Sequence, residues 1–374
     1  GGGPPLRGRR PCGRRRPSVG QHGRGSLVRR SSSHQMTRAR AARTFAFIYA
    51  TIARLASAVP VIDISTFLGG SDADRRKVGE LWDEAMMSTG MAVLIGHGVP
   101  RQTVDEMYET ALEFFELEHA QKMESCLNVG YGAGGFVPMG VEAVARSRAE
   151  GAGSPADLVE NLVFSHGGDP ALEAVMPAAP ASLQPAVALY WQRMEGLLRT
   201  IMELSAVALE LPADHFAADF AKPKCNLRLA HYPALGPDDD ERSAGALRYG
   251  AHTDYTGFTI LRQDRAADGL QAQLPNGSWV GVGAHPDGLV INAGDLIQVW
   301  TNDRWRSPPH RVLNPPAGQA AAARLSLVFF TGPADETIVE ALPTCVEDGP
   351  RPARYEPVSA HEHLMAKLRA SNTD

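Results

Sequence analysis

The chain has 374 residues, of which 44% are hydrophobic and 21% charged, with a formal net charge of −5. Residues 1–62 hold 13 Arg and no acidic residue, which leaves 24 basic against 42 acidic residues in 63–374. A region with so large an acidic excess is a poor non-specific binder of nucleic acid, because phosphate neutralisation needs clustered Lys and Arg. We therefore expect no nucleic-acid partner.

Residues 1–58 are rich in Arg, Ser and Gly and offer almost nothing to bury, so we expect a disordered leader. A start at Met36 would place the apolar run TFAFIYATIA before an A-x-A site, as in a signal peptide. An Arg-rich, acid-free leader also resembles an organelle transit peptide, and an incorrectly assigned start is equally compatible. The apolar run is about half the ~20 residues of a membrane span, so none is expected. The four scattered cysteines form no C-x-x-C pair and suit a reducing compartment, which favours the cytoplasm.

Residues 59–215 read as a mainly helical region with a few strands. VPVIDIS predicts a strand, and Ser71 with Asp74 predicts the start of a helix that stops at Gly90. MAVLIGHGVP predicts a strand and turn, residues 101–123 a second amphipathic helix, and residues 181–211 the longest helix. The Gly-, Ala- and Ser-rich residues 128–156 predict a long loop of the kind that often covers an active site.

Residues 216–340 change to short apolar runs separated by turn signals, followed by a C-terminal tail at 341–374 with a closing helix near 359–368. The predicted strands include NLRLAHYP, FTILRQD, GLQAQL, SWVGVG, GLVINAG, DLIQVW, HRVLN and RLSLVFF, with a tight hairpin turn at Asn276-Gly277. This pattern predicts a mainly β fold with helical support, in which a double-sheet jelly roll packs on the N-terminal and central helices.

Polar residues recur on one face of several of these strands. In GAHTDYTGFTIL, His252 and Asp254 lie two residues apart and share a face of an extended chain. Burying an imidazole beside a carboxylate is costly unless a partner compensates them. SPPHRVLNPP adds His310, and two imidazoles with one carboxylate are the facial ligand set of non-haem Fe(II) oxygenases. Three ligands on one side of an octahedron leave three adjacent positions for a bidentate co-substrate and O2.

A second anchor is predicted in RLSLVFF, where Arg324 and Ser326 share one face. A buried guanidinium favours a carboxylate in bidentate geometry, and no acidic residue lies nearby in the sequence AAAARLSLVFF. A dicarboxylic acid that chelates iron and pairs with Arg324 would satisfy both groups. In CNLRLAHYP, an even number of positions separates Asn226, Arg228 and Tyr232, so they lie on the same face of the predicted strand and are expected to face the same site.

These motifs resemble, in order, the isopenicillin N synthase-like branch of the 2-oxoglutarate/Fe(II)-dependent oxygenases. The resemblance covers residues 59–368 and rests on VPVIDIS, GMAVLIGHGVP, HYP, HTD, LVINAGDLIQVWTNDRW, SPPHRV and RLS. It implies a double-stranded β-helix core. It implies His252, Asp254 and His310 as iron ligands, and Arg324, Ser326 and Tyr232 as the site for the distal carboxylate of 2-oxoglutarate.

The expected activity is hydroxylation or desaturation of a small organic substrate, with O2 consumed and succinate and CO2 released. We expect Asn226, Arg228 and Tyr255 on the substrate side of the site. One alternative is an oxidase of the isopenicillin N synthase type, which uses no 2-oxoglutarate. Another is a zinc hydrolase or a non-catalytic binding protein, in which Arg324 and Ser326 would lack a purpose. Substrate identity and oligomeric state stay open.

Overall fold

The protein is described by a computed structural model that covers residues 59–125, 134–148, 151, 153–165, 176–236, 247–264, 269–315, 322–346 and 352–371. The expected leader at 1–58 lies outside these residues, as do parts of the expected loop at 128–156. The described residues belong to one compact unit. None of their helices combines the length and the apolar character needed to cross a membrane.

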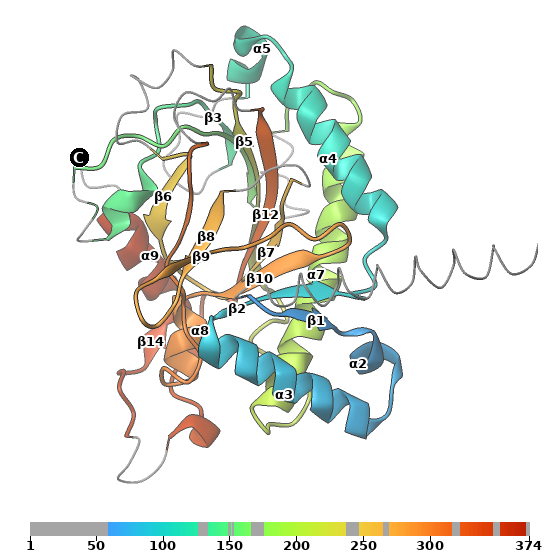
Figure 1. Cartoon of the computed structure of the whole chain (residues 1–374), viewed down its shortest axis with the longest axis vertical. Helices are drawn as coiled ribbons and strands as arrows, with labels where there is room; N and C mark the ends of the chain where they lie inside the picture. Colours follow the sequence, from blue (N-terminus) through green and yellow to red (C-terminus); the bar gives the residue numbers. More distant parts are fainter. Residues whose placement is uncertain are drawn as a thin grey trace, which may run out of the picture. The chain divides into compact units, whose positions relative to one another are not determined.

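Two β-sheets face each other and helices cover one of them (Figure 1). The major sheet has the spatial order β1 (Val61–Asp63), β2 (Met91–Ile95), β10 (Leu289–Ala293), β7 (Phe258–Arg262), β12 (Arg324–Gly332), β5 (Lys224–Tyr232), β4 (Glu160–Ser165) and β3 (Gly135–Val137). The minor sheet has the order β6 (Tyr249–His252), β11 (His310–Val312), β8 (Leu270–Gln273) and β9 (Trp279–Gly281). A small pair is formed by β13 (Ile338–Val339) and β14 (Val358–Ser359). The major sheet thus joins strands from both sides of residue 215.

The helices are α2 (Ser65–Gly69), α3 (Asp72–Ser88), α4 (Arg101–Phe115), α5 (His119–Met123), α7 (Leu183–Ala208), α8 (Asp295–Trp300) and α9 (Ala360–Ser371), with 3-10 turns η1 (Val144–Ser147) and η4 (Pro343–Cys345). The long helix α7 packs against α3 and α4, and together they cover the outer face of the major sheet (Figure 1). The predicted central helix is therefore confirmed as the spine of the helical layer.

Alternate side chains along the strands of the major sheet face two different apolar cores. On β12, Leu325, Leu327 and Phe329 are fully buried in the core beneath the helices. Their neighbours Arg324 and Ser326 face the opposite way, toward the space between the two sheets. A second core of mostly aliphatic residues from both sheets surrounds that space. The predicted jelly roll with helical support is confirmed, and its interior is where polar side chains collect.

Helix α3 begins with the predicted capping box. The Ser71 hydroxyl accepts from the Asp74 amide at 3.3 Å, and the Asp74 carboxylate accepts from the Ser71 amide at 2.9 Å. Removing such a cap typically costs about 1 kcal/mol of stability. We therefore expect Ser71→Ala to lower the free energy of unfolding by about that amount in urea titrations. Glu80→Ala, at an exposed position of the same helix, should stay within about 0.5 kcal/mol of wild type, and equal effects of the two changes would contradict the cap's role.

Two sequence predictions are wrong in element type or extent. The helix expected at 101–123 divides into α4 and α5, because Glu118 starts a second capping box with Gln121. The run DLIQVW, expected as a strand, forms helix α8. Leu296, Ile297, Val299 and Trp300 are buried at helical spacing, and a short apolar run cannot distinguish a strand from a helix by its pattern alone.

Two strands were missed. β3 lies within the stretch expected as a loop, and it pairs in an antiparallel manner with β4. β4 in turn pairs with β5 and extends the major sheet. Its sequence ENLVFS begins with Glu160, whose charge weakens an apolar pattern. The structure shows why this residue is tolerated, since Lys122 and His231 lie at 2.9 and 2.8 Å from its carboxylate.

Candidate active site

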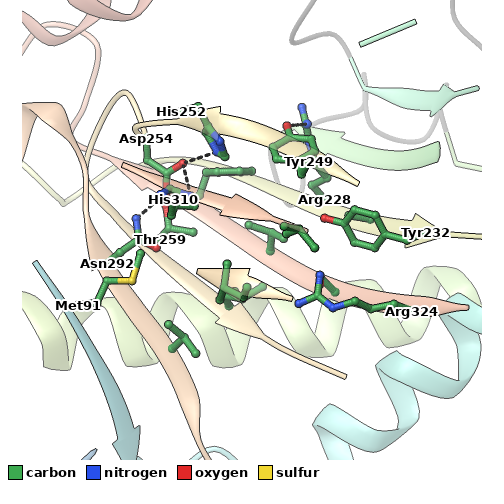
Figure 2. A pocket seen from close by; sticks show the side chains of 18 residues that line it. Met91, Arg228, Tyr232, Tyr249, His252, Asp254, Thr259, Asn292, His310 and Arg324 are labelled. Atoms are coloured by element: carbon green, nitrogen blue, oxygen red, sulfur yellow. Dashed lines mark hydrogen bonds and ion pairs between the residues drawn. The ribbon is translucent and has the colours of Figure 1, made fainter. Parts of the chain in front are cut away.

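The space between the sheets is a cavity of about 590 Å³, including its open mouth. Most of the residues predicted for the site line it, namely His252, Asp254, His310, Arg324, Ser326, Tyr232 and Arg228. Figure 2 labels all of these except Ser326. The rest of the wall is mainly aliphatic and aromatic.

One end of the cavity brings together two imidazoles and a carboxylate. The β6–β11 register places His310 directly opposite His252, and their ring centroids are 4.2 Å apart. The Nε2 atoms of His252 and His310 lie 3.6 and 3.7 Å from the Asp254 Oδ1 atom. One ligand atom from each of the three residues lies within 4.8 Å of the others, so the group could hold a metal ion.

The protonation states suit metal ligands, which must be a neutral imidazole and an ionised carboxylate. Burial, together with the nearby His252, lowers the pKa of His310 to about 4. Burial by itself would raise the pKa of Asp254, but His310, His252 and Thr259 hold it well below its usual range. At neutral pH Asp254 is therefore anionic while His310 is neutral, and the negative charge calls for a cation.

Hydrogen bonds on the far side of each imidazole orient it toward a common point. His252 Nδ1 lies 2.9 Å from the Gly250 carbonyl oxygen, and His310 Nδ1 lies 3.1 Å from that of Pro308. A carbonyl oxygen can only accept, so each Nδ1 donates and each Nε2 keeps its lone pair for a metal.

The Asp254 carboxylate is fixed by two donors that the sequence analysis did not identify. Its Oδ2 atom accepts from Asn292 Nδ2 at 2.6 Å and from Thr259 Oγ1 at 2.5 Å, which leaves Oδ1 toward the imidazoles. Thr259 and Asn292 are direct partners in the β7–β10 register. A polar Asn inside the apolar run LVINA was the available signal for this contact.

Loss of either donor should weaken metal binding more than folding. Changes to groups that orient metal ligands typically cost about 10–100-fold in affinity or activity. We expect Asn292→Ala and Thr259→Val each to raise the Fe(II) dissociation constant by about tenfold or more in anaerobic titrations. Thr301→Val is a matched control, because the buried Thr301 hydroxyl donates to the Ile297 carbonyl on α8. A similar change in Fe(II) affinity in this control would contradict the assignment.

The other end of the cavity holds a buried cation whose donors are only partly used. Arg324 is 1% exposed, and its Nη2 atom donates to Gln263 Oε1 at 3.3 Å. Its Nε and Nη1 atoms and the Ser326 hydroxyl are buried without a hydrogen-bond partner among the described residues. The guanidinium carbon lies 5.1 Å from the centre of the Tyr232 ring. Leaving such donors unsatisfied is costly, so these residues fit a bound carboxylate.

Three residues were expected on the substrate side, and only one of them lines the cavity. Arg228 does so, and its Nη1 atom donates to the Tyr249 hydroxyl at 2.8 Å and to Glu142 at 3.1 Å. Asn226 is outside the lining, because its amide donates to Ser165 on the neighbouring strand β4. Tyr255 is also outside the lining.

A jelly roll with two imidazoles and one carboxylate on one side of an interior cavity defines the class of non-haem iron oxygenases. The family model of the 2OG-Fe(II) oxygenase superfamily matches residues 223–333, and that of the non-haem dioxygenase N-terminal region in morphine synthesis matches residues 59–176. The 2-oxoglutarate-dependent dioxygenase citB of Monascus ruber is 32% identical over 285 residues, which cover 73% of this chain and 84% of that protein. The chain belongs to the 2-oxoglutarate/Fe(II)-dependent oxygenase superfamily.

Other relatives cover still more of the chain. Homoarginine-6-hydroxylase 2-ODD-233 of Oryza sativa subsp. japonica is 27% identical over 83% of this chain and 96% of its own length. The crystal structure of a full-length Neurospora crassa protein in complex with alpha-KG has a TM-score of 0.74 and 26% identity, and it covers 83% of this chain and 95% of that chain. As a member of this superfamily the protein uses Fe(II), 2-oxoglutarate and O2.

Proposed function

We propose that His252, Asp254 and His310 hold the Fe(II) ion and that Arg324, Ser326 and Tyr232 hold the distal carboxylate of 2-oxoglutarate. The protein is an Fe(II)- and 2-oxoglutarate-dependent oxygenase of a small organic substrate, which it oxidises with release of succinate and CO2. The observation that carries the residue assignment is that one cavity holds an anionic three-ligand group and a buried guanidinium with two nitrogens that lack a partner among the described residues. A 2-oxo dicarboxylate complements both.

The residues contribute orientation, charge and exclusion of water. When bound, Fe(II) with 2-oxoglutarate supplies the activation of O2 that oxidises an unactivated carbon. His252, Asp254 and His310 would supply three ligands to one side of a bound Fe(II) ion, which would leave the opposite side for co-substrate and O2. Arg324, which is 1% exposed and lines the other end of the cavity, would fix the direction in which a dicarboxylate can lie. The apolar walls, which include Leu261, Val290 and Val328, limit the access of water to the reaction.

The proposal also concerns the class of substrate. The similar structures include the same Neurospora crassa protein in complex with alpha-KG and thymine, and a rice dioxygenase for auxin oxidation, each 26% identical to this chain. We infer that the substrate here is likewise a free small molecule and not a nucleic acid, which the acidic excess of residues 63–374 supports. Hydroxylation of carbon is the proposed outcome. The comparisons favour neither an oxidase without 2-oxoglutarate nor a zinc hydrolase.

A succinate-release screen tests this proposal. Purified protein is incubated with Fe(II), 2-oxoglutarate and O2 over a panel of small organic molecules, and succinate and oxidised product are measured together. We expect at least one compound to give equimolar succinate and product, and His252→Ala to give neither. Stoichiometric zinc that supports hydrolysis, or oxidation that does not depend on 2-oxoglutarate, would overturn the proposed function.

A further inference from the structure

A second buried arginine, Arg248, lies near the Arg324 end of the same cavity without lining it. It is 4% exposed and comes directly before β6. Its Nη2 atom donates to the carbonyl oxygens of Ala322 at 2.9 Å and Pro233 at 3.5 Å. These residues lie just beyond the ends of β12 and β5, beside Arg324 and Tyr232. Arg248 is therefore fixed to the two strand ends that carry the proposed carboxylate site.

The Tyr232 ring lies close to both guanidinium groups. Its centre is 6.0 Å from the Arg248 guanidinium carbon and 5.1 Å from that of Arg324. The two guanidinium carbons are therefore at most about 11 Å apart, a distance at which buried charges still influence each other. Burial, followed by the charge of Arg324, lowers the pKa of Arg248. The Arg248 Nε atom is also buried without a hydrogen-bond partner among the described residues.

The acidic groups near this pair already have other partners. Asp264, whose negative charge favours the charged form of Arg248, accepts a hydrogen bond from the Tyr108 hydroxyl at 2.8 Å. Asp157, whose charge helps to raise the pKa of Tyr232, accepts hydrogen bonds from the backbone amides of Val144 and Gly250. The two guanidinium groups near the Tyr232 ring would both attract a carboxylate bound at Arg324.

We propose that Arg248 is a second cation for the distal carboxylate of 2-oxoglutarate and a positioning residue that selects a dicarboxylate over a 2-oxo monocarboxylate. This inference rests on the proposed function. Arg248 acts through space across the Tyr232 ring and not by direct contact, because it does not line the cavity. A carboxylate bound beside Arg324 would be about as far from Arg248 as Arg324 is, and one charge at about 11 Å in a partly buried setting corresponds to roughly tenfold in affinity.

The test compares two ligands that differ only at the distal end. 2-Oxopentanoate carries the same 2-oxo acid group as 2-oxoglutarate but has a methyl group in place of the distal carboxylate. Dissociation constants of both are measured by anaerobic calorimetric titration of the Fe(II)-loaded protein. We expect Arg248→Met to weaken 2-oxoglutarate binding roughly tenfold and to leave 2-oxopentanoate binding unchanged. Arg248→Lys, which keeps the charge, should restore most of the affinity for 2-oxoglutarate.

A purely structural role of Arg248 gives a different result. If the residue only ties Pro233 to Ala322, its loss should lower stability and weaken both ligands equally. Equal loss for the two ligands, or no loss for either, would overturn the inference. Arg304→Met is the matched control, since it removes a partly buried guanidinium paired with Asp83 and should leave the ratio of the two constants unchanged. Wild-type protein that bound no 2-oxoglutarate would instead overturn the proposed function itself.

Discussion

His310→Ala should abolish stoichiometric Fe(II) binding and with it all succinate formation. The change removes one of three ligands and leaves Asp254, 5% exposed, with a single imidazole beside it. Loss of a direct ligand should exceed the roughly 10–100-fold effect typical of the residues that merely orient ligands. We therefore expect the Fe(II) dissociation constant to rise by more than about a hundredfold in anaerobic titrations.

A matched control separates this effect from a general effect of losing a histidine. His361 is exposed on α9 and lies 3.9 Å from Asp335, outside the cavity. His361→Ala should bind Fe(II) as wild type does. The assignment fails if His310→Ala retains tight, stoichiometric Fe(II) while it remains folded.

Arg324→Met should remove most of the affinity for 2-oxoglutarate and leave Fe(II) binding intact. The methionine keeps an apolar stem but offers no donor, whereas the guanidinium has two buried nitrogens available for a carboxylate. Hydrogen bonds to charged groups contribute about 1.5–3 kcal/mol each, so two of them correspond to at least about a hundredfold in the dissociation constant. Calorimetry with 2-oxoglutarate on the Fe(II)-loaded protein measures this change.

Arg324→Lys provides the graded comparison. Lysine keeps the charge but loses the planar, bidentate geometry, so its affinity for 2-oxoglutarate should fall between those of wild type and Arg324→Met. Removal of a buried cation with unsatisfied donors should also leave the stability of the ligand-free protein equal or higher. Unchanged 2-oxoglutarate affinity in Arg324→Met would show that the co-substrate is held elsewhere in the cavity.

The sequence predicted the parts of this fold in which local pattern and burial agree. β12 alternates between the helix core and the cavity as RLSLVFF indicated, and α3 starts at the predicted cap. Prediction failed where tertiary contacts determine which secondary structure a segment adopts. Helix α8 is specified by the amides of Asp295 and Leu296, which donate to the carbonyl oxygens of Asp254 and Thr256, and no local pattern reports such contacts.

In the candidate site, too, some residues could be predicted from local pattern and others could not. The residues carried by motifs converge on one cavity, because the alternate residues of β5 and β12 that face away from the helices meet the minor sheet there. Thr259 and Asn292 could not be found from spacing, since their meeting at Asp254 depends on the register of two strands that are distant in the sequence. Asn226 shared the parity of Tyr232, yet a side chain on β4, a strand that was not predicted, engages its amide. Arg248 precedes its strand and carries no periodic signal.

The most direct test is a crystal structure of the protein grown anaerobically with Fe(II) and 2-oxoglutarate. Anomalous scattering would locate the iron, and the density would show both carboxylates of the co-substrate. We predict iron bound by His252, Asp254 and His310 together, chelated by one end of the acid, with the opposite carboxylate on Arg324 and Ser326. Iron bound away from these three side chains, or a distal carboxylate seated on Arg228, would contradict this account.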